Sequence, residues 1–391
     1  MKRILYALCI SLIVALLASY VLGCTPRTTA SAETTALVSG VKAAYLTDAD
    51  GKVEMYAYEA DRRYPIASMV KIMTALLTVE AIDEGTLALD EKVVVSPTAM
   101  GMGGSQMFLN AGDEYTVDDL LKGVVVVSAN DACVALAERL AGSEGAFVAR
   151  MNEKALALGM RNTHFANCTG LPHPEGYSCA KDVARMLRAL VSHEVYHRYS
   201  TIWLEDFHHP DGRTTTFTNT NKLVRFYQGC DGGKTGYTSE AGFCLAATAK
   251  KADMRVVSVV IGATDSKTRF AESSKLLNYA FASYRFAPLA AVGDEVAVAE
   301  VRCGKAKTVA LGVRRPLGVL ARVGEKPRAE LRLEPTSLKA PVAEGDAVGK
   351  AYLVVDGVVA DETDLVALST VVEGTYGDAL HSLLDGYALK R

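Results

Sequence analysis

The stretch from Ser68 to Ile82 constrains the fold of this chain more than any other segment. Its sequence, SMVKIMTALLTVEAI, is apolar on nearly every face of a helix. A helix that is hydrophobic all round is a buried one, because it has no polar face to offer to water. We therefore expect a buried helix here, with the ionisable side chain of Lys71 inside it.

Ser68 and Lys71 stand at positions i and i+3, so they share one face of that helix. A serine at a helix N-terminus lies where partial positive charge favours an alkoxide. A lysine desolvated by apolar neighbours can lose its proton near neutral pH. The pair therefore predicts a nucleophile with its own base.

The pattern S-x-x-K is weak by itself, because the chain holds a second copy at Ser178 and Lys181. The two copies differ in their downstream sequence. Only the first precedes both Ser128-Ala129-Asn130 and, further along, Lys234-Thr235-Gly236. Three such motifs in this order are the signature of penicillin-binding proteins and class A β-lactamases.

Each further motif has a chemical reason to be present. The Ser128 hydroxyl can relay a proton to a leaving nitrogen, and the Asn130 amide can hold a peptide carbonyl and orient Lys71. Lys234 and Thr235 offer a cation and a hydroxyl donor to a substrate carboxylate. We expect these side chains to meet in one site.

Gly236 has no side chain, so a substrate backbone can approach that strand and pair with its edge. The backbone N–H groups of Ser68 and Tyr237 would then form an oxyanion hole. Taken singly, Lys234 could be a solvated loop charge and Ser128 a helix cap. Together and in this order, the residues favour catalysis.

With these motifs, the chain resembles the D-alanyl-D-alanine carboxypeptidases of the low-molecular-mass penicillin-binding proteins, peptidase family S11. The likeness covers about residues 40–372 and includes YPIASMVKIMTALL, TNTNKLV, DGGKTGYTSEAGFCLAATA and LKAPVAEGDAVGKAYLVVDG. It implies an α+β penicillin-binding and serine β-lactamase-like transpeptidase fold. Such a fold has an antiparallel sheet flanked by helices, a helical subdomain and then a small all-β domain.

The resemblance also implies an activity, the removal of the terminal D-alanine from peptidoglycan pentapeptide stems through a Ser68 acyl-enzyme. β-Lactam antibiotics would be covalent inhibitors, and neither a cofactor nor a metal would be needed. Arg269 in TRFAESSKLL is the expected equivalent of an arginine that supports carboxylate binding. Val70 stands where the family often has Thr, and Ala129 replaces the Asp of S-D-N, as is common in this family; neither position donates a catalytic group.

Two other functions stay open from the sequence. A class A-like β-lactamase would share the motifs but needs a glutamate in an E-x-x-L-N stretch for deacylation. Residues 166–170 read ANCTG instead. A cell-wall scaffold protein with little catalysis is the other alternative, and the intact motif residues count against it.

Residues 193–197 read HEVYH, which matches the zinc-peptidase pattern H-E-x-x-H. His208 and His209 could supply a third ligand. By the resemblance, however, this stretch lies in a connecting segment where the family carries no metal. We therefore expect a surface or packing pair of histidines.

The first 24 residues predict export, because Lys2 and Arg3 precede an uncharged, mostly apolar run from Ile4 to Gly23. That run is also long enough to span a bilayer. Three outcomes compete: a lipidated Cys24, ordinary cleavage after Ala30-Ser31-Ala32, and an uncleaved anchor. Each places the protein outside the cytoplasm, at the outer face of the membrane or in the cell-wall space.

The remaining divisions rest on composition and periodicity. We expect a linker over 25–38, a D,D-peptidase catalytic domain over 39–287, a β-rich domain over 288–375 and a possible amphipathic helix over 376–391. Whether that last helix contacts a membrane, docks on the protein or frays stays open. The net charge of −3 includes no basic excess that would suggest nucleic acid.

Local patterns predict several individual elements. The predicted helices are 130–142, about 147–158 and 268–284, and the predicted strands are 242–249 and 255–262. Asp50-Gly51 and Asp356-Gly357 are expected turns between strands. Six cysteines beyond the N-terminal segment show no C-x-x-C pairing and are interpreted as small buried hydrophobes, with their disulfide state open.

Overall fold

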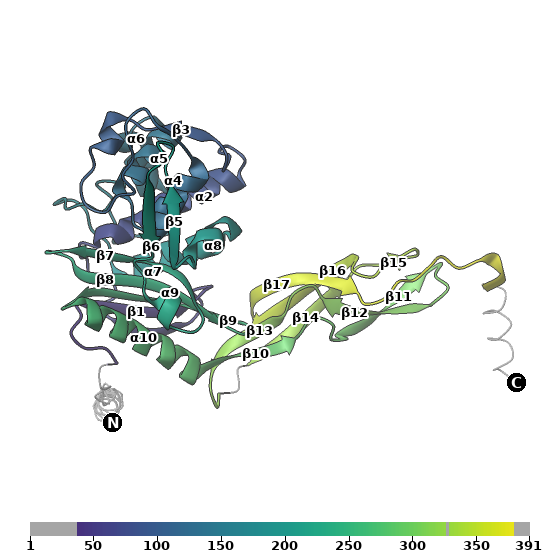
Figure 1. Cartoon of the computed structure of the whole chain (residues 1–391). Helices are drawn as coiled ribbons and strands as arrows, with labels where there is room; N and C mark the ends of the chain where they lie inside the picture. The colour runs from purple at the N-terminus through teal and green to yellow at the C-terminus, as the bar shows by residue number, and fades with distance from the viewer. Residues whose placement is uncertain (1–36, 326–327, 379–391) are drawn as a thin grey trace, which may run out of the picture. The chain divides into compact units, whose positions relative to one another are not determined.

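The computed structural model describes residues 37–325 and 328–378. Predictions made for residues 1–36 and 379–391 lie outside this part of the chain. The catalytic region is built on a five-stranded antiparallel sheet with the strand order β2-β1-β9-β8-β7 (Figure 1). The strands are β1 (Ala43–Asp48), β2 (Glu54–Tyr58), β7 (Cys230–Thr238), β8 (Gly242–Lys251) and β9 (Met254–Ala263). Strand β7 is one edge of the sheet.

Two long helices pack against this sheet from opposite sides, α7 (Ala180–Val191) and α10 (Ser266–Ser283) (Figure 1). Helix α10 begins after Asp265, whose side chain accepts a hydrogen bond from the N–H of Thr268. The predicted strands, the predicted hairpin at Asp50-Gly51 and the closing helix are all confirmed, with boundaries that shift by no more than two residues.

A helical part covers the sheet on the side of α7 and surrounds α2 (Lys71–Asp83), which contacts α4, α5, α6 and α7. All residues of α2 are buried except Glu80, Ile82 and Asp83. The predicted buried helix is therefore confirmed, with one correction. Ser68 lies in a short 3₁₀ turn, η1 (Ala67–Val70), and the α-helix begins only at Lys71.

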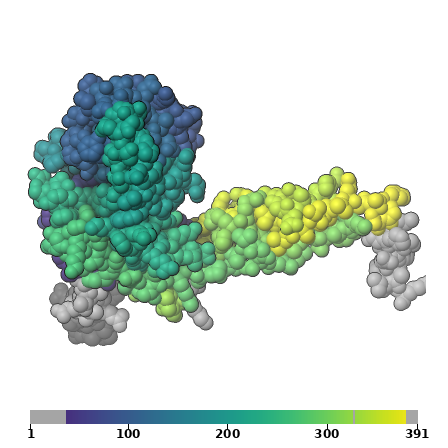
Figure 2. Space-filling model, in the orientation of Figure 1, coloured from purple at the N-terminus to yellow at the C-terminus, as the bar shows by residue number. Residues whose placement is uncertain are grey.

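The other elements of this part are mostly short. They are α3 (Pro97–Met100), α4 (Val117–Val126), α5 (Asn130–Ala141), α6 (Glu144–Ala157), α8 (Glu194–Ser200), α9 (Leu223–Phe226) and the hairpins β3–β4 (Lys92–Val94, Glu114–Thr116) and β5–β6 (Leu204–His208, Thr214–Thr218). Figure 2 shows the β5–β6 hairpin on the surface of the helical part. The predicted helices at 130–142 and 147–158 are confirmed as α5 and α6.

The C-terminal region contains β-strands and, as predicted, is all-β. Strand β10 (Tyr284–Ala290) pairs with β13 (Leu317–Arg322), and a second sheet has the order β14-β16-β17-β12-β11-β15. The strands of this second sheet are β11 (Ala297–Arg302), β12 (Thr308–Val313), β14 (Ala329–Pro335), β15 (Leu338–Lys339), β16 (Ala347–Val355) and β17 (Val358–Ala367). Asp356 and Gly357 join β16 to β17 with φ angles of 49° and 81°, the signs that a tight hairpin turn of two residues requires. The α+β fold with a β-rich second part is thus confirmed.

Two further observations concern the described ranges. None of their helices has both the length and the apolar character needed to cross a bilayer. All six cysteines in them are free thiols, and five are buried as expected. Cys303 is exposed, so the interpretation as a buried hydrophobe is wrong for that residue.

Candidate active site

The serine and lysine of the first S-x-x-K motif are in direct contact. The Lys71 ammonium donates a hydrogen bond to Ser68 Oγ at 3.0 Å and another to the backbone carbonyl of Thr169 at 2.5 Å. Lys71 is only 1% exposed, and this burial lowers the pKa of its amine. Within the described ranges it forms no ion pair with a carboxylate. The structure therefore holds a hydroxyl beside an amine that is poised to lose its proton.

The loop that supplies the Thr169 carbonyl is folded by one asparagine. Asn167 Oδ1 accepts hydrogen bonds from the backbone N–H groups of Thr169 and Gly170, and its amide donates to the carbonyl of Leu171. Gly170 has a φ of +83°, and a Cβ at this position would lie 2.1 Å from the carbonyl oxygen of Ala67. The loop thus packs directly against the 3₁₀ turn that carries the nucleophile.

Sequence reasoning did not assign a role to this loop. It used residues 166–170 only to argue against a β-lactamase. A signal was nevertheless present, because an asparagine three residues before a glycine is typical of a tight turn closed by the asparagine side chain. What the sequence could not show is that the turn meets Lys71.

Ser128 lies between α4 and α5, and Asn130 is the first residue of α5, a helix that packs beside α2. Ser128 is buried with a φ of 66°, and its hydroxyl has no hydrogen-bond partner among the described residues. The N-cap of α5 is Ala129 and has no side-chain cap, so Ser128 is not a helix cap. A buried hydroxyl without a partner costs free energy, and a functional role offers an explanation for it.

The Asn130 amide nitrogen donates to the carbonyl of Gly103 at 2.6 Å, and its Oδ1 is buried without a partner in the described residues. The expected contact with Lys71 is not among its hydrogen bonds. The amide therefore offers a free acceptor rather than a direct support for the lysine.

The third motif lies on β7, at the edge of the sheet. Lys234 and Thr235 are both buried, and the Lys234 ammonium donates to the carbonyl of Thr235 at 3.1 Å. Burial holds the pKa of Lys234 well below its usual range, and the charge of Lys71 lowers it further. A Cβ on Gly236 would lie 2.7 Å from the carbonyl oxygen of Ile66 and 3.1 Å from the nitrogen of Ser68. Only glycine lets this strand approach the nucleophile so closely.

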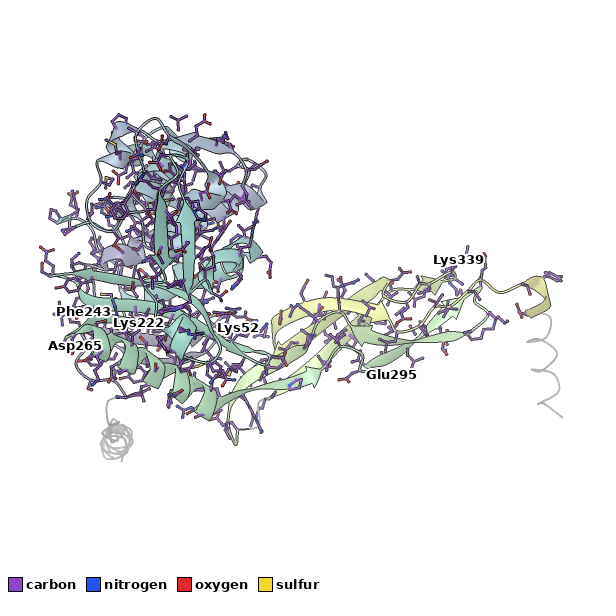
Figure 3. The ribbon with its side chains drawn as sticks, viewed as in Figure 1. Lys52, Lys222, Phe243, Asp265, Glu295 and Lys339 are labelled. Atoms are coloured by element: carbon purple, nitrogen blue, oxygen red, sulfur yellow. The ribbon has the colours of Figure 1, made fainter. Side chains whose placement is uncertain are left out.

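Arg269 supports β7 from α10. Its guanidinium donates to the carbonyls of Gly236 at 3.2 Å and Cys244 at 3.3 Å, and it lies over the ring of Phe243. Figure 3 labels Phe243, on β8, and Asp265, the residue that precedes α10. Tyr237 is 57% exposed, and its ring centroid lies 4.3 Å from that of Phe243. Contacts thus connect Ser68, Lys71, Gly236 and Arg269.

The second S-x-x-K copy does not form such a pair. The Ser178 hydroxyl shares a hydrogen bond with the hydroxyl of Thr163 at 2.8 Å. The Lys181 ammonium instead forms an ion pair with Glu54 at 3.1 Å, and this hydrogen bond raises its pKa.

The histidines of HEVYH have ordinary partners. The His193 ring contacts the carboxylate of Asp83 at 2.5 Å, and the His197 ring contacts the carbonyl of Val191 at 2.9 Å. His209 is buried between the hydroxyls of Tyr115 and Thr215. Over the described ranges, no three His, Cys, Asp or Glu side chains come together as a metal ion would require.

Comparison with known proteins agrees with this arrangement. Residues 28–265 match the family model of the D-alanyl-D-alanine carboxypeptidases, peptidase S11. Residues 284–373 match the model of the C-terminal domain of penicillin-binding protein 5. Arg269 lies between the two matched ranges.

Individual relatives cover most of the chain. A D-alanyl-D-alanine carboxypeptidase of Bacillus subtilis, DacF, is 40% identical over 85% of this chain and 86% of its own. The solved structure of penicillin-binding protein 5 from Haemophilus influenzae is 31% identical, covers 85% of this chain and 98% of its own, and has a TM-score of 0.64. The solved structure of PBP3 from Streptococcus pneumoniae is 27% identical, covers 85% of this chain and 99% of its own, and has a TM-score of 0.71. The chain therefore belongs to the S11 family of D-alanyl-D-alanine carboxypeptidases.

Proposed function

We propose that this protein is a serine carboxypeptidase that removes the terminal D-alanine from peptidoglycan pentapeptide stems through an acyl-enzyme at Ser68. The observation that carries the proposal is the 3.0 Å contact between Ser68 Oγ and the buried amine of Lys71. A lysine deprotonated by desolvation takes the proton of Ser68 as the hydroxyl attacks the carbonyl of the penultimate D-alanine.

Charge develops on that carbonyl oxygen as the attack proceeds. The backbone N–H groups of Ser68 and Tyr237 are the proposed donors to it, and the close approach of Gly236 to Ser68 N supports this pairing of strand and turn. The Ser128 hydroxyl, which has no partner among the described residues, relays a proton to the departing nitrogen. D-Alanine leaves as the acyl-enzyme forms, and water then hydrolyses the acyl-enzyme and releases the shortened stem.

The terminal carboxylate of the substrate supplies a counter-charge that the described site lacks. Lys234 and Arg269 are buried, and neither forms an ion pair within the described ranges. Burying unpaired cations is costly, so an anion that enters the site gains their charge-assisted hydrogen bonds. Lys234 and Thr235 bind this carboxylate directly, and Arg269 holds the strand that presents them.

The same groups explain a proposed sensitivity to penicillin. A β-lactam carries a reactive amide and a nearby carboxylate, so it would occupy the positions of the scissile bond and the terminal carboxylate and acylate Ser68. We place the enzyme outside the cytoplasm, because the first 24 residues have the composition of an export signal. It is held at the membrane by a lipid on Cys24 or an uncleaved anchor, or is released into the cell-wall space by ordinary cleavage.

Purified protein incubated with pentapeptide muropeptides tests the proposal. Mass analysis should show the loss of one alanine residue, and a fluorescent penicillin should label the protein covalently. Replacing Ser68 with Ala should abolish both. If the folded wild type is not labelled and releases no D-alanine, the proposal fails, and a scaffold role is favoured.

The β-lactamase alternative gives a different result in the same experiment. A β-lactamase would hydrolyse penicillin with rapid turnover, so the label would disappear within seconds, and muropeptides would stay intact.

A further inference from the structure

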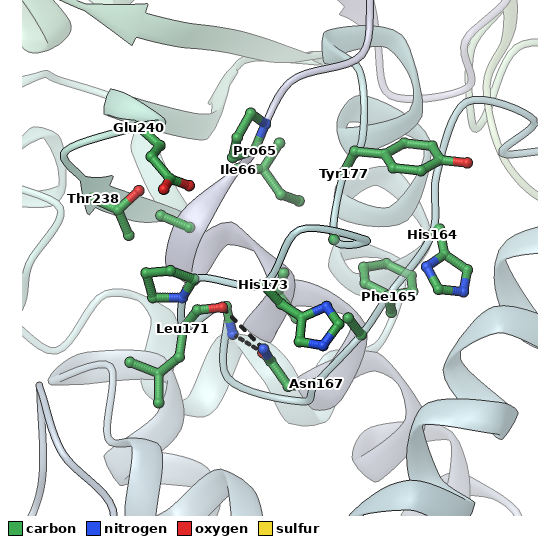
Figure 4. Close-up of a pocket in the computed structure, with 16 residues that line it drawn as sticks. Pro65, Ile66, His164, Phe165, Asn167, Leu171, His173, Tyr177, Thr238 and Glu240 are labelled. Carbon is green, nitrogen blue, oxygen red and sulfur yellow. Dashed lines mark hydrogen bonds between the residues drawn. The ribbon is translucent and has the colours of Figure 1, made fainter.

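A hollow adjoins η1, the 3₁₀ turn that carries Ser68. It is lined by residues 65–67 and Val70, by the loop 164–177, and by Thr238 and Glu240 after β7 (Figure 4). It is a shallow hollow, open to solvent, with an accessible volume of about 30 Å³. Ala67 and Val70 belong to this turn, so a group in the hollow lies next to the segment that carries Ser68.

One charge dominates the lining. Among the described residues that line the hollow, Glu240 supplies the only carboxylate near the strand end, and no lysine or arginine lines it. Figure 4 shows Glu240 and Thr238 on one side, across from Asn167 and His173. Apolar side chains such as Ile66, Phe165 and Leu171 share the remaining surface about equally with polar groups. Such a site suits a side chain with an apolar stem and a cationic end.

The Glu240 carboxylate is available for a ligand. It is exposed, and within the described ranges it takes part in no ion pair. The Lys42 ammonium does come near, but it donates to the backbone carbonyl of Glu240 at 2.9 Å. Some other surface carboxylates have partners, as Glu54 does with Lys181.

The distance along β7 fits a peptide stem. From Thr235 to Thr238 an extended strand advances about 10 Å, and a substrate paired with the same edge places its third residue about 7 Å from its terminal residue. A side chain the length of lysine then spans the rest of the way to Glu240. The carboxylate end at Lys234 fixes the direction in which the stem runs.

We propose that this hollow is the subsite for the third residue of the stem and that Glu240 binds a primary ammonium at the end of its side chain. This inference rests on the proposed carboxypeptidase function. Lysine and diaminopimelate both carry the required ammonium, and diaminopimelate adds a carboxylate beside it. Glu240 is therefore a specificity-determining residue of this chain.

The test compares kcat/KM for D-alanine release from Nα-acetyl-L-Lys-D-Ala-D-Ala and from its Nα,Nε-diacetyl form. The wild type should favour the peptide with the free ammonium by about two- to five-fold, the range of an exposed ion pair. The ratio should fall to about one in Glu240→Gln. It should also fall as salt screens the pair.

A matched control removes a carboxylate elsewhere. Glu153 on α6 is exposed, so Glu153→Gln makes the same change in net charge and should keep the wild-type ratio. A third peptide with meso-diaminopimelate separates the two sources of the ammonium. If Glu240→Gln lowers kcat/KM for both the lysine and the diaminopimelate peptide, the subsite recognises the ammonium alone. If it lowers kcat/KM for the lysine peptide only, the subsite selects lysine.

A ratio that is unchanged in Glu240→Gln overturns the subsite while leaving the carboxypeptidase in place. If neither peptide releases D-alanine although fluorescent penicillin labels Ser68, the proposed function fails instead. Binding to the subsite is then measured by how well each peptide protects Ser68 from labelling by penicillin. Equal protection by the peptide with the free ammonium and by its acetylated form overturns the subsite.

Discussion

The chain contains the same four-residue motif twice in nearly the same local setting. Ser68 and Ser178 each precede a helix, and Lys71 and Lys181 each lie in the first turn of that helix. One lysine is buried and bonded to its serine, whereas the other points to Glu54 at the surface. Spacing on a helix thus brings a serine and a lysine to one face, but it does not make them a pair.

The difference lies in the surroundings of each lysine. Helix α2 is enclosed by other helices, so Lys71 has few partners besides Ser68 and the Thr169 carbonyl. Helix α7 presents Lys181 toward solvent, where a carboxylate takes the ammonium. Burial lowers the pKa of Lys71, while the Glu54 hydrogen bond raises that of Lys181. Reactivity therefore depends on the packing around the motif.

The largest expected effect comes from replacing each lysine with methionine, which keeps the length of the side chain. Lys71→Met should slow acylation by penicillin by about 10²- to 10⁴-fold, the usual contribution of a general base. Lys181→Met should stay within about two-fold of the wild type. Stopped-flow labelling measures both rates, with thermal unfolding as a check on folding. Equal rates in the two variants would remove the distinction between the copies.

The second largest effect is expected for a substitution in the loop that packs against the 3₁₀ turn of Ser68. Gly170→Ala meets the Ala67 carbonyl and also needs a positive φ, so we expect acylation to fall by at least about 10-fold together with a loss of about 2–4 kcal/mol in stability. Gly159→Ala is the control, because Gly159 has a φ of +72° but open space around it. That variant should lose only about 1 kcal/mol and keep its acylation rate. A Gly170→Ala variant as active as Gly159→Ala would contradict the role of the loop.

The two lysines should give pH dependences of opposite sign. The folded pKa of Lys71 is lowered, so below its ordinary value of 10.5 the unfolded chain binds more protons, and stability falls with falling pH by up to about 1.4 kcal/mol per unit until the folded pKa is reached. The pKa of Lys181 is raised, so its contribution is full below 10.5 and is lost as pH rises through the folded value.

Urea unfolding of the wild type, Lys71→Met and Lys181→Met across pH measures these contributions. Relative to Lys71→Met, the wild type should weaken as the pH falls. Acylation should also slow at low pH, since only neutral Lys71 acts as the base. If the free energy of unfolding of Lys71→Met depends on pH as steeply as that of the wild type, the pH dependence arises from Lys234 instead.

The smallest effect is expected for Ser178→Ala. This change removes one buried hydrogen bond to Thr163, so we expect a loss of about 0.5–1.5 kcal/mol in stability. The rate of acylation should match the wild type. A slower rate, measured on folded protein, would show that the second copy supports the site after all.

Much of the fold could be predicted from local patterns. The all-apolar stretch at α2, the periodic helices and the Asp-Gly turns depend on residues close in sequence, and the structure has these elements. The 3₁₀ turn at Ser68 was missed. Its start, at Ala67 with a φ of 47°, is set by the packing of Gly170 and Gly236 against it rather than by local propensity.

The residues of the site could be predicted from the sequence, but the hydrogen bonds between them and distant segments could not. The motifs named Ser68, Lys71 and Lys234, because chemistry requires these residue types in order. The Thr169 carbonyl and the Gly103 carbonyl that binds Asn130 could not be inferred, since both contacts join segments far apart in sequence. Glu240 matched no motif and became visible only when the lining of the hollow was known.

The hydrogen bond from Lys71 to Thr169 also sets an order of events during folding. The donor and acceptor are 98 residues apart, so a chain that has emerged only as far as α5 carries both the serine and the lysine without the carbonyl that holds the amine. Long-range contacts of this kind form late, because the loop between them must first be closed. The nucleophile is thus dormant while the chain is being made and becomes reactive only once the helical part has closed around it.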